Sequence, residues 1–123
     1  MGPGDPKYKA PNFQGSVMEG HSFFRSFGEK ESEEIEKGIR TQSLSVGDHQ
    51  VRRMVFDPGT PIPVHRPPED IGTLILEGRM EMTGGCETRT LGPGELFLIP
   101  SGSDHGGRAL EDRVVAVSFS RRW

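Results

Sequence analysis

The chain has 123 residues, of which 32% are hydrophobic, and it carries a formal net charge of −3. This length predicts one domain with its own core and excludes two full domains. The negative charge argues against nucleic-acid binding, because phosphate backbones are bound by concentrated basic surfaces.

The cysteine content and the apolar runs exclude further classes of protein. Cys86 is the single cysteine, which excludes an internal disulfide and a zinc site built from cysteines alone. No apolar run approaches the roughly 20 residues that cross a bilayer. Residues 1–11 lack the apolar centre of a signal peptide, so we expect a cytoplasmic protein with no membrane partner.

The N-terminal third carries little periodic pattern. Residues 1–12 are rich in glycine and proline and are predicted to form a flexible arm, and residues 22–27 a first short strand. The charge run over residues 29–37 has almost no apolar stripe, so a charged surface loop is favoured over a short solvated helix. We therefore expect an N-terminal arm and charged loop over residues 1–38, and one barrel domain over residues 39–123.

From residue 39 onward, apolar and polar residues alternate with the period of β-strands. Turn clusters rich in glycine and proline separate the runs at intervals near ten residues, with no helical pattern between them. This spacing predicts an all-β antiparallel barrel or jelly roll. The predicted strands are residues 39–45, 50–57, 73–76, 79–83, 87–91, 96–99 and 113–119.

Strand parity places one arginine on the inner face of the barrel. In the strand over residues 50–57, Arg52 shares a face with Met54 and Phe56, whereas Arg53 lies on the opposite face. An inward guanidinium either meets an anion or reaches water from the strand end, and the second alternative is favoured. The first would indicate an anionic small-molecule ligand.

Two histidines lie in segments where glycines or prolines recur at fixed distances from the histidine. The first segment holds Gly59, His65 and Gly78, in register with G-x5-H-x-H-x3-E-x6-G. The second matches G-x5-P-x-G-x2-H-x3-N at four positions, which are Gly94, Pro100, Gly102 and His105. In these two motifs the chain resembles the cupin superfamily over roughly residues 39–120, and within it the small single-domain members. The resemblance implies an RmlC-like double-stranded β-helix and a homodimer.

The departures from the two motifs concern the metal ligands of the family. Pro67 replaces the second histidine, Ile71 the glutamate and Ala109 the asparagine. The resemblance implies a divalent metal, such as Fe, Mn, Ni or Zn, held by His65 and His105. Glu69 and Asp70 are out of register, but either carboxylate could complete a two-histidine, one-carboxylate set. The alternative is that no metal binds and that both histidines are polar groups of the cavity wall.

Without a metal, His65 and His105 could still act as catalytic acid and base, because an imidazole titrates near neutral pH. The resemblance implies an enzyme of the lyase, isomerase, cyclase or oxygenase type, acting on a small organic acid, sugar or natural-product intermediate. A non-catalytic cupin that binds or senses a small molecule is the alternative. Fold alone does not choose between an enzyme, a sensor and a partner-binding protein.

Overall fold

The computed structural model describes residues 23–121, so the arm predicted for residues 1–12 lies outside the described part of the chain. Strands dominate these residues, and none of their helical turns is long and apolar enough to span a bilayer. The elements in chain order are η1 (Phe27–Glu29), β1 (Glu33–Glu36), β2 (Ile39–Val46), β3 (His49–Phe56), β4 (Pro61–His65), β5 (Ile71–Glu77), β6 (Met80–Gly84), β7 (Glu87–Leu91), β8 (Leu96–Ile99), β9 (His105–Ala109) and β10 (Val114–Arg121).

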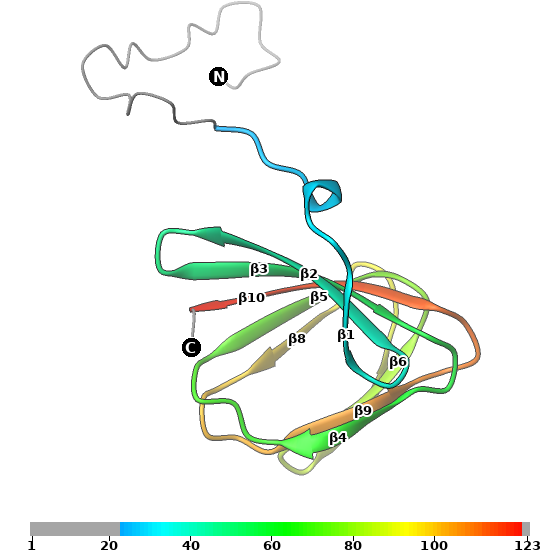
Figure 1. Ribbon diagram of the computed structural model, residues 1–123. Helices are drawn as coiled ribbons and strands as arrows, with labels where there is room; N and C mark the ends of the chain where they lie inside the picture. Colours follow the sequence, from blue (N-terminus) through cyan, green and yellow to red (C-terminus); the bar gives the residue numbers. More distant parts are fainter. Residues whose placement is uncertain (1–22, 122–123) are drawn as a thin grey trace, which may run out of the picture.

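The strands form two antiparallel sheets that face one another across a common interior (Figure 1). One sheet has the order β1-β2-β3-β10-β5-β8 and the other the order β4-β9-β6-β7. The chain crosses repeatedly between the sheets, so that β10 lies between β3 and β5. Such crossing connections are typical of a jelly roll. The predicted all-β double-stranded β-helix is therefore confirmed.

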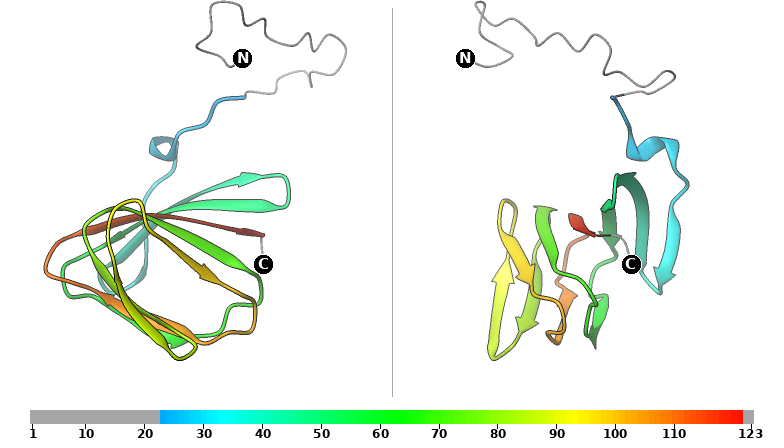
Figure 2. Two further views of the ribbon diagram at one scale, coloured as in Figure 1. Left: turned by 180° about the vertical axis from the view of Figure 1, so that it is seen from behind. Right: turned by 90° about the vertical axis from the view of Figure 1, so that its left-hand side faces the viewer.

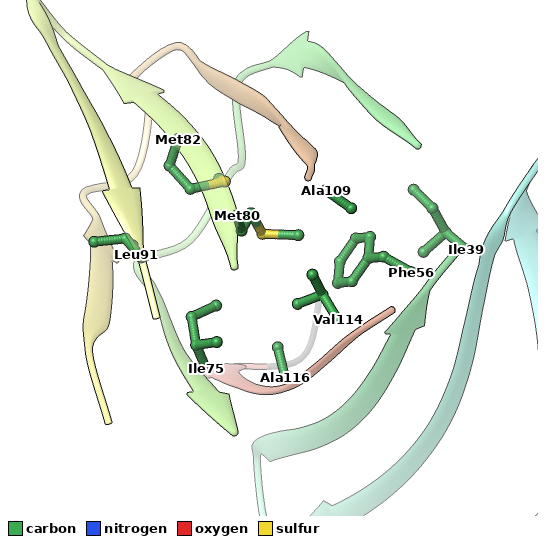
Figure 3. Close-up of a cluster of buried hydrophobic side chains, with 9 residues drawn as sticks. All are labelled: Ile39, Phe56, Ile75, Met80, Met82, Leu91, Ala109, Val114 and Ala116. Atoms are coloured by element: carbon green, nitrogen blue, oxygen red, sulfur yellow. The ribbon is translucent and has the colours of Figure 1, made fainter. Parts of the chain in front are cut away.

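The apolar core fills one end of the space between the sheets (Figure 3). In the six-stranded sheet, Phe56 pairs with Ile39 on one side and with Val114 on the other. In the facing sheet, Met80 is fully buried. Burial of each large side chain contributes roughly 1.5–3 kcal/mol. The remaining buried members of the cluster are Ile75, Met82, Leu91, Ala109 and Ala116.

The glycines of the two sequence motifs occupy turns that need a left-handed backbone. Gly59, Gly78, Gly94 and Gly102 have φ angles of 73°, 80°, 87° and 76°. L-residues with a Cβ rarely adopt this region, so glycine is the default residue there. At Gly78 a Cβ would also lie 2.3 Å from the carbonyl oxygen of Arg113. The motif spacing therefore reflects where the chain must reverse direction.

The seven strands predicted from residue 39 onward are present, with ends shifted by at most two residues. Three strands, β1, β4 and β9, were not predicted. The loop prediction for residues 29–37 is wrong at β1, which pairs with β2 as an edge strand. The strand predicted for residues 22–27 is wrong for its described residues, since residues 23–26 are in no strand and Phe27 begins η1.

The segment before β1 packs on the outside of the barrel rather than inside it. In the right-hand view of Figure 2, η1 lies beyond β2, away from the four-stranded sheet. The Nε2 group of Gln42 on β2 donates hydrogen bonds to the carbonyl oxygens of Phe27 and Lys30, at 2.9 and 3.0 Å. These bonds tie the segment to β2 and leave the interior to the two sheets.

Candidate functional site

The structure brings His65 and His105 into contact. His65 ends β4 and His105 begins β9, and the two residues are direct partners in the ladder between these strands. Their ring centroids lie 3.9 Å apart, with an angle of 62° between the ring planes. Two imidazoles that are 40 positions apart in the sequence therefore form one pair, which we call the histidine pair.

His65 has a defined tautomer in this arrangement. Its Nδ1 atom lies 3.0 Å from the carbonyl oxygen of Pro63. A carbonyl oxygen only accepts, so Nδ1 carries the proton and donates it in this bond. The lone pair of the neutral ring then resides on Nε2, which is the atom that can accept a proton or bind a ligand.

His105 is the buried member of the pair, with 6% of its surface exposed. Burial first, and the neighbouring His65 second, lower the pKa of His105 to about 4. The ring is therefore neutral at physiological pH. Its Nδ1 atom is buried without a hydrogen-bond partner among the described residues. An unsatisfied buried polar atom is costly to the stability of the folded chain.

The histidine pair lines a cavity of about 310 Å³ between the two sheets. Near the core the wall is apolar, with Phe56 and Met80. Toward the histidines it becomes polar, because the inner faces of β3 and β10 change from apolar to polar side chains. The polar and charged wall residues are Glu36, Gln50, Arg52, His65, Thr73, His105, Ser118 and Ser120.

Two loops beside the histidines are tied together outside the cavity. The Arg66 guanidinium binds Asp104 through two N–H groups, Nε to Oδ1 at 2.9 Å and Nη2 to Oδ2 at 3.3 Å. This bond lowers the pKa of Asp104 and raises that of Arg66. Gly102 N–H donates to the carbonyl oxygen of Pro67 at 2.8 Å. Asp104 therefore ties the loop next to His105 to the loop that follows β4.

The two carboxylates considered as metal ligands lie elsewhere. Asp70 Oδ1 accepts a hydrogen bond from Ser101 N–H at 2.8 Å. Asp70 and Glu69 line a separate hollow with His49, whose ring is exposed and lies 2.8 Å from the carboxylate of Asp48.

The donor atoms around the histidine pair decide whether it fits a metal ion. Within residues 23–121, no three side chains of histidine, cysteine, aspartate or glutamate converge on one point. A divalent transition metal is normally held by three or four protein ligands. The described side chains supply two imidazoles, so they do not fit the metal that the sequence resemblance implies.

Several wall residues were missed by sequence reasoning. Parity left open which arginine faces inward, and the structure selects Arg52, which lies within β3 rather than at its end. Ser118 and Ser120 follow Val114 and Ala116 on one face of β10. This change from apolar to small polar residues along one face was the available signal for the polar end of the cavity.

Comparison with known proteins agrees with this architecture. The family model described as "Cupin domain" matches residues 52–119. KdgF from Halomonas sp. has 30% sequence identity and a TM-score of 0.72, over 84% of this chain and 96% of that chain. An RmlC-like cupin from Shewanella frigidimarina has 22% identity and a TM-score of 0.73, over 83% and 93% of the two chains, which supports the fold alone.

A third structure is a named enzyme. The DMSP lyase DddQ from Ruegeria pomeroyi has 27% identity and a TM-score of 0.58, over 63% of this chain and 40% of that chain. No curated protein matches the chain. The matched family model covers more than half of the sequence. The chain belongs to the cupin family.

Proposed function

We propose that this cupin is an enzyme that moves a proton on a small organic molecule held against the histidine pair. The contact between His65 and the buried, neutral His105 in the wall of a 310 Å³ cavity carries this proposal. Clefts of this size accommodate small ligands. The similarity to a named lyase, DddQ, supports a lyase reaction among the classes that the sequence leaves open.

The two rings have different roles in the proposed step. His65 accepts a proton from a carbon of the ligand at Nε2, because its Nδ1–H is already engaged by Pro63. His105 stays neutral, so the pair carries one positive charge after the transfer rather than two. The electron pair released at carbon either expels a group from the neighbouring carbon, which is a lyase reaction, or is reprotonated elsewhere, which is an isomerase reaction.

A test needs no knowledge of the natural ligand. The purified protein is incubated in D₂O with small carboxylic acids and sugar acids, and NMR follows deuterium uptake and new products. We expect exchange or turnover of at least one compound, and a loss of 100-fold or more in His65→Gln. Arg53→Ala, on the opposite face of β3, serves as the matched control and retains the activity. Activity that survives in His65→Gln would contradict the assignment.

The non-catalytic alternative has its own observation, which is the incomplete set of metal ligands. Compounds that bind but show neither exchange nor turnover would support a small-molecule sensor. Metal analysis of protein purified without added metal or chelator is the companion measurement. We expect far less than one metal ion per chain, and a full equivalent that disappears in His65→Ala and His105→Ala would contradict a metal-free site.

A further inference from the structure

Strand register places several polar side chains in one row across the inner face of the six-stranded sheet. Arg52 of β3 pairs with Ser43 of β2 on one side and with Ser118 of β10 on the other. Ser118 pairs in turn with Thr73 of β5, which pairs with Phe97 of β8. Four of these five residues line the cavity, Ser43 being the exception. We call Arg52, Ser118 and Thr73 the polar row.

The polar row contains a positive charge that no carboxylate of the described residues neutralises. Within residues 23–121, every arginine except Arg52 and Arg53 has a carboxylate within 4.0 Å. Arg52 is half-buried and uses two N–H groups, Nε to Ser43 Oγ and Nη2 to Gln50 Oε1, both at 3.3 Å. Its Nη1 group has no partner in the described part of the chain. Partly burying an unpaired charge is unfavourable unless a counter-ion binds to the charged group.

Two other residues of the polar row carry hydroxyl groups that can donate hydrogen bonds to a ligand. The hydroxyl groups of Ser118 and Thr73 line the cavity and form no hydrogen bond with the described protein. Glu36 also lines the cavity, but it pairs with Ile39 at the level of Phe56, four residues along β3 from Arg52. At about 3.3 Å per residue, that level is roughly 13 Å away. The cation and the hydroxyls therefore stand together, apart from the acidic group.

The strand next to the polar row contacts the histidine pair. Phe97 of β8, which pairs with Thr73, has its ring centroid 6.0 Å from that of His105. An acidic group held at Arg52 would therefore leave the rest of a small molecule in the same cavity as the two imidazoles.

We propose that the polar row is a carboxylate-binding subsite, in which the Arg52 guanidinium, Ser118 and Thr73 hold the acidic group of a small organic acid that faces the histidine pair. A guanidinium binds the two oxygens of a carboxylate through parallel N–H bonds. The subsite rests on the proposed function, because it names the ligand class of the same cavity.

The test compares benzoate with benzamide, which has nearly the same shape and no charge, by calorimetric titration of the full chain. We expect benzoate to bind at least ten-fold more tightly than benzamide, and Arg52→Ala to remove that difference. Arg52→Gln keeps most of the side-chain volume and guards against a packing defect. Arg53→Ala is the matched control, because Arg53 lies on the opposite face of the same strand and should leave binding unchanged.

The alternative outcomes overturn the subsite. Equal affinities for benzoate and benzamide, equal losses in Arg52→Ala and Arg53→Ala, or no benzoate binding by the native chain would each contradict it. Tighter binding of inorganic phosphate than of benzoate would overturn the choice of a carboxylate. The two proposals fail separately: Arg52-dependent binding without turnover overturns the enzyme and leaves the subsite. Turnover that does not depend on Arg52 overturns the subsite and leaves the enzyme proposal standing.

Discussion

At the scale of single residues, His105 links the cavity to the pH dependence of stability. Its pKa is about 4 in the folded protein, against about 6.5 for an exposed imidazole. The unfolded chain therefore binds a proton between these values while the folded chain does not. Stability rises with pH wherever the unfolded state binds more protons. The buried His105 ring therefore lowers the free energy of unfolding progressively as the pH falls from 6.5 toward 4, and it has no such effect above pH 6.5.

The expected result is a smaller free energy of unfolding at pH 4.5 than at pH 7. Of this decrease in the free energy of unfolding, about 2 kcal/mol is due to His105. Urea unfolding of the native chain and of His105→Gln at both pH values isolates this share, because carboxylate contributions cancel in the comparison. An identical pH dependence in both proteins would show that His105 titrates normally when folded.

The sequence predicts the histidine pair better than the rest of the cavity wall. The motif spacing points to His65 and His105, because glycine turns fix where each strand begins and ends. It could not show that Asp70 accepts the Ser101 N–H rather than approaching the histidines. That outcome depends on how the loops after β4 and β8 meet, which is a tertiary property.

At the scale of elements, the strands that were missed are those with weak β-propensity. β4 contains Pro61 and Pro63, which are tolerated because β4 is an edge strand. β9 contains Gly107, where a Cβ would lie 2.2 Å from the carbonyl oxygen of Glu81. β1 is short and acidic, a composition that protects exposed sheet edges from other strands. In each case the sheet position outweighs local propensity.

The glycines in the turns differ in how much space surrounds their Cα atoms. Gly47 and Gly78 both have positive φ, but a Cβ at Gly47 meets nothing within 4 Å, whereas one at Gly78 meets the backbone of Arg113. We expect Gly47→Ala to cost about 1–2 kcal/mol of stability through backbone strain alone. Gly78→Ala should cost at least about 2 kcal/mol more, because the β5–β6 turn must move away from the β10 side. Thermal unfolding of both variants measures the difference, and equal losses would refute the steric explanation.

At the scale of the whole molecule, each sheet is apolar at the core end and polar at the histidine end. This division explains how a chain with 32% hydrophobic residues has both a packed core and a cavity. The outer face of the six-stranded sheet also exposes Leu98 and Phe119, which flank Gly72 in one row across β8, β5 and β10. The homodimer stays a prediction, and sedimentation velocity of the purified chain tests it.

The most direct measurement follows the side-chain NMR signals of Arg52, His65 and His105 during a titration with benzoate. If the cavity holds one small acid between the polar row and the histidine pair, all three signals shift along one binding curve. The Nε signal of Arg53 should stay in place. Histidine signals that do not respond while Arg52 binds benzoate, or that follow a different dissociation constant, would contradict a single site.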